Sequence, residues 1–169
     1  MSMQYIPRTE SSVPAMATET KEPVAQPPVA APPPEKKARD LDEVVVLVTG
    51  YRGWTDVKRI AAELGALEDD YPGAGLTLVH GGCAGADLMA ARHAENRGWT
   101  VIEEKADWDK HGRRAGPIRN QRMIDVHKPD VVLAFLDPLS RGTLDCLRRA
   151  REYAASGKKL HVDIRVVNA

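Results

Sequence analysis

The stretch 43–53, "EVVVLVTGYRG", passes from an apolar run directly into a glycine-containing turn. Residues 43–48 include four valines, and an unbroken run of β-branched residues is typical of a strand that is buried on both faces. Thr49–Trp54 is the predicted turn. A helix follows it, with Thr55 as the expected N-cap and apolar residues at helical spacing on its buried face, namely Val57, Ile60, Ala61, Leu64 and Leu67. This strand–turn–helix unit is the building block of a parallel α/β sheet.

The same unit recurs along the chain. Further strands are predicted at Leu76–His80, Trp99–Glu103, Asp130–Leu136 and Lys159–Val166. Further helices are predicted from after Gly85 to Gly98, from Pro117 to His127 and from Gly142 to Ser156, the last with Leu144, Leu147, Ala150 or Arg151, and Ala154 on its apolar face. Strands alternating with helices predict an α/β fold: a three-layer Rossmann-like domain with a mainly parallel sheet.

Residues 1–40 differ in composition from the rest of the chain. They contain eight of the twelve prolines, among Ala, Glu, Thr, Ser and Lys. Proline interrupts both helix and sheet. The segment also has too little apolar surface to offset the entropy that is lost when a chain becomes ordered. We therefore expect a disordered Pro/Ala-rich tail over 1–40, acting either as a spacer or as a docking segment for a protein partner, and one folded domain over 41–169.

Bulk charge and composition exclude several classes of function. The chain has 24 basic and 24 acidic residues, whereas a protein that grips a nucleic-acid backbone normally shows a basic excess, so nucleic acid is an unlikely partner. The sequence has no apolar run long enough to cross a membrane and no export signal, which predicts a cytoplasmic protein. The two cysteines do not stand at metal-binding spacing with the histidines, so we expect no metal and no required cofactor.

Three glycine-containing turns are expected to meet at one edge of the sheet. They are Thr49–Gly53, Gly81–Asp87 and Ser140–Thr143. Turns of this kind direct free N–H groups and the positive end of a helix dipole toward a ligand, which favours phosphate or another anion. Arg52, Arg119 and Arg141 lie in or near the same turns, and arginine suits bidentate recognition of such a group. Neither GxGxxG nor GxxxxGK[ST] is present, so a standard dinucleotide or P-loop site is not expected.

Four motifs in order carry a family resemblance. The strings "VTGYRGWTD", "LVHGGCAGADLMAARHAENRG", "ADWDKHGRRAGPIRNQRMID" and "DVVLAFLDPLSRGTLDCLRRARE" resemble the YspA-like (cpYpsA-related) branch of the SLOG superfamily, formerly called DUF2493. The resemblance spans about 44–162. It implies a Rossmann-like domain that binds a nucleotide or a nucleotide-derived ligand. Lonely guy phosphoribohydrolases and DNA-processing protein A are distant relatives, and YspA-like members are frequent in actinobacteria, phages and mobile elements.

The resemblance and the turns together give the expected site. Asp87 is expected to bond either loop amides or a ribose hydroxyl, Trp108 either to stack on a base or to cover core, and His80 either to bond a neighbouring loop or to do acid–base work. Tyr51 stands where the family's TGSR motif has a small residue. The expected ligand-binding residues are Thr49, Gly50, Tyr51, Arg52, His80, Gly81, Gly82, Cys83, Ala84, Gly85, Asp87, Trp108, Arg119, Asn120, Arg141, Gly142 and Thr143.

The main functional hypothesis is a nucleotide-binding module that works as a sensor or in processing. The alternative is a phosphoribohydrolase-like N-glycosidase, with Asp145 as the catalytic carboxylate and Arg119 holding phosphate or stabilising charge. The relatives' PGGxGTxxE motif would place glutamate at Cys146, whereas this chain has its acid one residue earlier and one methylene shorter. A nucleic-acid adaptor is the second alternative. The relatives also make a homo-oligomer an expectation.

Overall fold

The computed structural model describes residues 42–159 and 161–169. The tail predicted over 1–40 lies outside the described residues. Within them, the predicted alternation of strands and helices is confirmed. The strands are β1 (Glu43–Gly50), β2 (Gly75–His80), β3 (Thr100–Glu103), β4 (Val131–Leu136) and β5 (Asp163–Asn168), and the helices are α1 (Val57–Asp70), α2 (Ala86–Asn96), α3 (Trp108–His111), η1 (Gly112–Arg114), α4 (Ala115–His127) and α5 (Arg141–Ala155).

The five strands form one parallel sheet in the order β3-β2-β1-β4-β5. The central strand β1 pairs with β2 through Leu47 and Val79, and with β4 through Leu47 and Val132. Val46, Leu47 and Val48 have no exposed surface. The valine-rich run therefore forms a strand covered on both faces, as its composition predicts.

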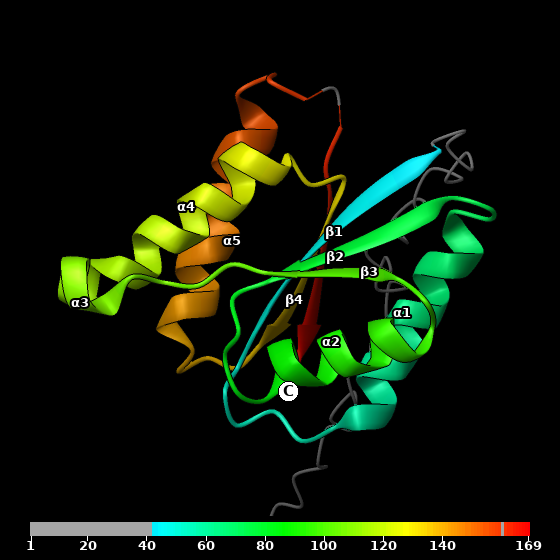
Figure 1. The fold of residues 1–169 in the computed structure, drawn as a ribbon, viewed down its shortest axis with the longest axis horizontal. Coiled ribbons are helices and arrows are strands. Elements are labelled where there is room, and N and C mark those ends of the chain that lie inside the picture. The colour runs from blue at the N-terminus through cyan, green and yellow to red at the C-terminus, as the bar shows by residue number, and fades with distance from the viewer. Residues whose placement is uncertain (1–41, 160) are drawn as a thin grey trace, which may run out of the picture. The chain divides into compact units, whose positions relative to one another are not determined.

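Helices cover both faces of the sheet, which makes the three layers (Figure 1). On one face, α1 and α2 contribute Ile60 and Ala90 to a core that also contains Val46. On the other face, α4 and α5 contribute Met123 and Ala150 to a second core around Leu47. The predicted Rossmann-like α/β architecture is confirmed.

The order of the strands reverses beside β1. The chain moves outward from β1 to β2 and β3, and then returns to place β4 on the other side of β1. The loops that leave the carboxyl ends of β1 and β4 consequently diverge to opposite faces of the sheet. In open α/β sheets, such a switch point is where ligands bind.

Two local predictions about helix 57–70 and the segment before α4 were wrong. The N-cap of α1 is Asp56, whose carboxylate accepts from the Arg59 N–H at 2.9 Å, and not Thr55. The segment before α4, predicted as a polar loop, contains α3 and η1, because the Asp107 side chain accepts from the Lys110 N–H and starts a helical turn. As a result α4 begins at Ala115, two residues before the predicted start.

The predicted apolar face of α5 is correct at Leu147 and Ala150, which are buried, and wrong at Leu144. Leu144 is 44% exposed, whereas the neighbouring Thr143 and Cys146 are buried. A shift of one residue turns a helix face by about 100°, and Thr143 and Cys146 pack inward although they are less apolar than leucine. None of the helices that the structure describes is long and apolar enough to span a membrane.

Candidate functional site

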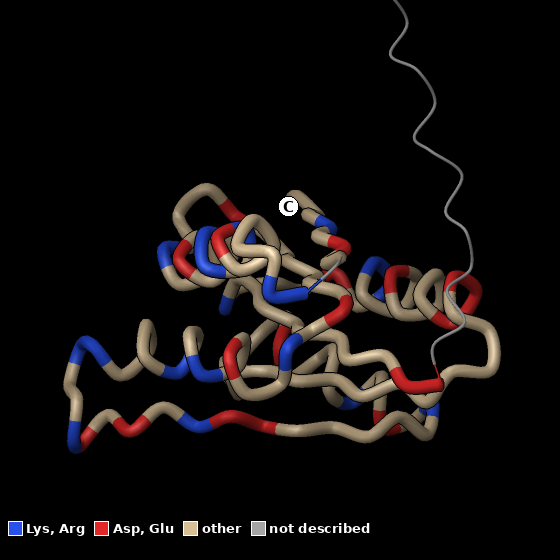
Figure 2. The backbone as a smooth tube through the Cα atoms, turned by 90° about the horizontal axis from the view of Figure 1, so that it is seen from above, with Lys and Arg blue, Asp and Glu red and all other residues tan. Residues whose placement is uncertain are grey.

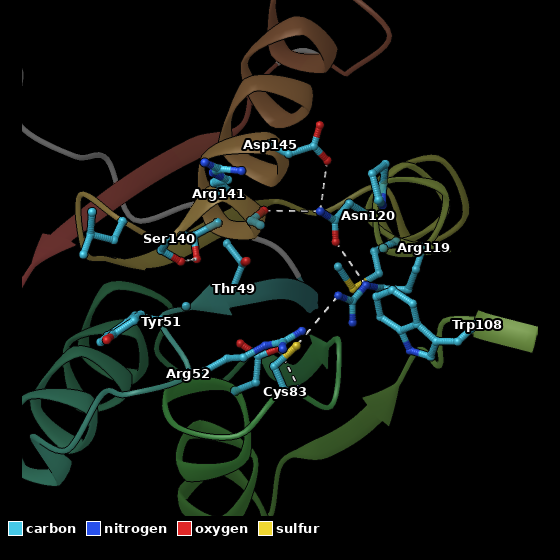
Figure 3. A pocket seen from close by; sticks show the side chains of 18 residues that line it. Thr49, Tyr51, Arg52, Cys83, Trp108, Arg119, Asn120, Ser140, Arg141 and Asp145 are labelled. Atoms are coloured by element: carbon cyan, nitrogen blue, oxygen red, sulfur yellow. Dashed lines mark hydrogen bonds between the residues drawn. The ribbon is translucent and has the colours of Figure 1, made fainter. Parts of the chain in front are cut away.

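A cavity of about 450 Å³ opens where the strand order reverses, at the carboxyl ends of β1 and β4 (Figure 3). Cavities that bind small molecules usually measure about 300–1,000 Å³. Five parts of the chain supply the walls: the turn after β1, the second glycine turn with the start of α2, Trp108, α4 as far as Met123, and the turn before α5 with the start of α5. The lining residues are Thr49, Gly50, Tyr51, Arg52, Cys83, Asp87, Trp108, Gly116, Pro117, Arg119, Asn120, Met123, Leu139, Ser140, Arg141, Gly142, Thr143 and Asp145.

Three arginines line this cavity, and one of them is held in place. Arg52 and Arg141 are exposed, whereas Arg119 is half-buried. Arg119 donates from Nε to Asn120 Oδ1 at 3.0 Å and from Nη1 to the Gly81 carbonyl. Its Nη2 lies 3.9 Å from Cys83 Sγ, which is a weak acceptor. The guanidinium is thus already oriented, with one nitrogen that has no strong acceptor in these contacts.

Asn120 connects the two helices that flank the cavity. It is 4% exposed, and its Nδ2 donates to Asp145 Oδ2 at 3.1 Å and to the Gly142 carbonyl at 3.3 Å. Its Oδ1 accepts from Arg119. Figure 3 shows this side chain between Asp145 and Arg119. Asn120 therefore fixes Arg119 relative to the start of α5.

Asp145 lies in an ion-pair network. Its Oδ2 accepts from Arg149 Nε at 2.9 Å, and its Oδ1 accepts from Arg148 at 3.0 Å. Burial raises the pKa of Asp145, but hydrogen bonds from Arg149, Asn120 and Arg148 outweigh it and lower the pKa overall. An ionised carboxylate with both oxygens occupied cannot serve as a general acid, although it can stabilise positive charge.

The N-terminus of α5 keeps its first amide groups free of a side-chain cap. Ser140 occupies the N-cap position but makes no capping bond, because its hydroxyl pairs with that of Thr143 at 2.6 Å. The positive end of the α5 dipole therefore faces the cavity where Gly142 and Thr143 line it. This end of the helix suits an anionic group.

The second glycine turn is arranged differently from the prediction. The Asp87 carboxylate accepts from the N–H groups of Gly81 at 3.1 Å and Cys83 at 3.5 Å. The Gly82 N–H donates to His80 Nδ1 at 3.0 Å. The expectation of free amides along this turn was wrong, because nearby side chains occupy them. Of the alternatives left open by the sequence, Asp87 bonds loop amides and His80 bonds a neighbouring loop.

Burial shifts the pKa values of both side chains. Asp87 is 3% exposed, and burial raises its pKa to about 6, although Arg119 and the backbone N–H groups of Cys83, Gly81 and Gly50 oppose the shift. Its Oδ1 atom is buried without a hydrogen-bond partner. Burial lowers the pKa of His80, so the imidazole is neutral and accepts from Gly82.

Close packing between the first two turns depends on two glycines. Gly85 has a φ of +75°, and a Cβ there would lie 2.5 Å from the carbonyl oxygens of Tyr51 and Arg52. A Cβ on Gly50 would lie 2.3 Å from that of Ala86. Only hydrogen fits at these positions, so the glycines let the start of α2 approach the end of β1.

The two aromatic side chains of the cavity differ in position. Trp108 is 52% exposed, and its ring packs near Gly116 at the start of α4. The ring of Tyr51 lies over Gly53, beside the turn after β1. Figure 3 shows these two side chains on opposite sides of the cavity. Of the alternatives for Trp108, the exposed ring is available for stacking and does not cover core.

The predicted residues divide between two neighbouring cavities. Gly81, Gly82 and Ala84 line a smaller cavity of about 260 Å³, together with Arg52, Cys83, Ala106, Trp108 and Arg119. His80 and Gly85 line neither of the two. The sequence did not point to four lining residues of the larger cavity: Gly116, Pro117, Met123 and Leu139. The Gly-Pro pair at 116–117 is the one signal for them, since small residues there leave room beneath Trp108.

Cys83, Asp87 and Asp145 are the cysteine and carboxylate side chains that line the larger cavity. Among the residues that the structure describes, no group of three or more His, Cys, Asp or Glu side chains could hold a metal ion. Both cysteines are free, and burial raises the pKa of Cys146 to about 12. Cys83 is the partly exposed thiol and lines both cavities.

Comparison with known proteins gives one family match and one curated relative. The model of the YspA, cpYpsA-related SLOG family matches residues 44–111. The Gene 61 protein of Mycobacterium phage D29 is 41% identical over 116 residues, which cover 63% of this chain and 88% of the phage protein.

Two solved structures of DNA processing protein A share the fold. The Streptococcus pneumoniae protein aligns with a TM-score of 0.54 at 19% identity, over 73% of this chain and 50% of its own. The Helicobacter pylori protein, described for its single-stranded DNA binding mode, aligns with a TM-score of 0.51 at 18% identity, over 66% of this chain and 62% of its own. This chain thus spans between half and two thirds of those longer proteins.

Proposed function

This chain belongs to the YspA, cpYpsA-related SLOG family, and from that premise we propose that its larger cavity binds a nucleotide or nucleotide-derived ligand, as a sensor or processing module. The observation that carries the proposal is the lining of that cavity. Three arginines and the uncapped N-terminus of α5 lie around one opening at the switch point, and an exposed tryptophan lies at its side.

The phosphate of the ligand binds at the start of α5. The amides of Gly142 and Thr143 supply donors there, and the guanidinium groups of Arg52, Arg119 and Arg141 supply charge-assisted bonds. Asn120 and Gly81 already orient Arg119, so little side-chain entropy is lost when it binds.

The base stacks on Trp108, whose ring is half-exposed and lies beside Arg119 in the lining of the cavity. Stacking of a base on an aromatic side chain contributes about 1–3 kcal/mol and tolerates any base. The chain has three tryptophans, of which Trp54 and Trp99 are buried at 6% and 9% exposure. Fluorescence changes on ligand binding therefore report chiefly on Trp108.

Tryptophan fluorescence during titration with AMP, GMP, CMP and UMP tests the proposal. We expect saturable quenching by at least one nucleotide, and loss of the quenching in Trp108→Phe. Arg52→Gln weakens binding by about tenfold, since it removes one charge-assisted hydrogen bond. Arg151→Gln is the matched control, because Arg151 is exposed on α5 and lines neither cavity. Absence of saturable binding by all four nucleotides refutes the proposal.

Hydrolysis of an N-glycosidic bond is less well supported. The ionised Asp145 carboxylate suits stabilisation of a cationic sugar, but a departing base needs a proton from another group. Asp87 is the one carboxyl group in the lining with a raised pKa, so a fraction of it is protonated near neutral pH. Its side chain is buried away from solvent. Chromatography of free base after incubation with the bound nucleotide separates binding from hydrolysis.

Binding of single-stranded nucleic acid is a second candidate function. Lys110, Arg113 and Arg114 follow the exposed Trp108 on α3 and η1, and exposed aromatics among basic residues are typical of single-strand binding. However, Figure 2 shows acidic and basic residues interspersed along the backbone of the domain. A gel shift with an oligonucleotide decides: tight binding near 0.15 M salt that weakens steeply with added salt supports this candidate.

A further inference from the structure

The smaller cavity adjoins the larger one and shares its central wall. Arg52, Cys83, Trp108 and Arg119 line both cavities. The rest of the smaller cavity, which measures about 260 Å³, is formed by the second glycine turn and Ala106. It is below the usual size for a whole nucleotide but suits one ring-sized group.

The shared wall has the chemistry of a diphosphate site. It contributes two guanidinium groups, which match the charge of a diphosphate bridge, and an aromatic ring beside them. A cysteine thiol adds no charge of its own when protonated. A bridging anion over this wall would have one end in each cavity.

Local packing keeps Arg119 in that wall. A Cβ on Gly81 would lie 1.7 Å from Arg119 Nη1, so the guanidinium rests directly on the backbone of the second turn. The Gly81 carbonyl accepts from the same nitrogen. Glycine at this position therefore allows Arg119 to lie between the two cavities.

The interior of the smaller cavity is lined by small side chains and has a carboxylate nearby. Gly82, Ala84 and Ala106 leave the space open. A Cβ on Gly82 would lie 2.5 Å from Glu103 Oε1, so this carboxylate is adjacent to the turn. A carboxylate next to a cavity lined by these small residues and by Trp108 suits the hydroxyl groups of a sugar.

We propose that the two cavities together bind one nucleoside diphosphate derivative, with its nucleotide in the larger cavity, its diphosphate over Arg52 and Arg119, and a sugar-sized group in the smaller cavity. This inference rests on the proposed nucleotide function and names the class of ligand. It predicts that the second moiety adds affinity that a nucleoside monophosphate or diphosphate lacks.

Isothermal titration calorimetry of the full chain tests this with matched series. The probes are AMP, ADP and ADP-ribose; GMP, GDP and GDP-mannose; UMP, UDP and UDP-glucose; and CMP, CDP and CDP-glucose. For the base that binds, we expect the diphosphate sugar to bind about tenfold or more tightly than the nucleoside diphosphate.

Blocking the smaller cavity then removes that gain. Ala84→Phe fills it from an exposed position that does not line the larger cavity, and Ala106→Leu fills it from a second lining position that is also absent from the larger cavity. Either variant should bring the diphosphate sugar to within about twofold of the diphosphate, with the monophosphate unchanged. Ala62→Phe, on the exposed face of α1, is the control and should leave every affinity unchanged.

The possible failures are distinct. Equal affinities for the diphosphate and the diphosphate sugar in the wild type overturn the inference and leave nucleotide binding standing. The same holds if Ala84→Phe and Ala106→Leu leave the gain intact or weaken the monophosphate equally. If none of the four monophosphates binds, the proposed function itself fails, and this inference fails with it.

Discussion

Replacement of Asn120 by alanine tests the link between α4 and α5. The substitution removes two hydrogen bonds donated by Nδ2 and one accepted from Arg119. A hydrogen bond to a charged group contributes about 1.5–3 kcal/mol and a neutral one about 0.5–1.5 kcal/mol. Asp145 keeps its bonds to Arg148 and Arg149, so we expect the lower end of the sum, a loss of about 3.5 kcal/mol in the free energy of unfolding.

Urea denaturation followed by circular dichroism measures this loss as a lower midpoint at unchanged slope. Asn96→Ala is the matched control, because Asn96 is exposed at the last residue of α2. We expect the control to change stability by less than about 0.5 kcal/mol. A difference below about 1 kcal/mol between the two variants would refute the assignment of Asn120 as a buried tie.

Three further predictions concern individual residues near the cavities. Burial raises the pKa of Asp87 from 3.8 to about 6, so this side chain stabilises the folded state below pH 3.8 and loses that contribution as the pH rises to about 6. Asp87→Asn should remove this pH dependence. Urea titrations should then show that the free energy of unfolding of the variant rises by up to about 3 kcal/mol relative to that of the wild type between pH 4 and 7. Gly85→Ala should lower the free energy of unfolding by about 3 kcal/mol or more, because the new Cβ would clash with backbone. Gly112→Ala should lower it by about 1 kcal/mol, because Gly112 has a φ of +49° but open space around it. Equal losses of stability in thermal melts of the two variants would contradict this. Iodoacetamide should label Cys83 and leave Cys146 unlabelled in the folded protein, as measured by peptide mass spectrometry. Labelled protein should no longer bind the nucleotide. Labelling of Cys146 at a rate similar to that of Cys83 would contradict the burial of Cys146.

The fold could be predicted from the sequence because the strands are continuous apolar runs. No polar residue interrupts the valines of β1 or the run 131–136, and such continuous apolar strands predict a parallel sheet covered on both faces. On α5 the prediction failed at Leu144, which is exposed while Thr143 and Cys146 are buried, because tertiary packing and not helical spacing decides which of these residues face the core.

The candidate site was partly predictable for a similar reason. Turns after parallel strands lie at one edge, so the grouping of Arg52 and Arg141 followed from topology. Asp87 accepts hydrogen bonds from loop amides, and Asp145 is paired with two arginines. These contacts depend on side-chain geometry, for which the spacing of residues in the sequence gives no signal.

Backbone amide NMR of the ¹⁵N-labelled protein tests the central claim most directly. During titration with the four nucleoside monophosphates, the account predicts saturable shifts of the Gly142 and Thr143 amides together with residues of the turn after β1, and none at Gly98, which lies outside the cavity at the far end of α2. Shifts confined to other parts of the domain, or no saturable shift with any of the four, would contradict it.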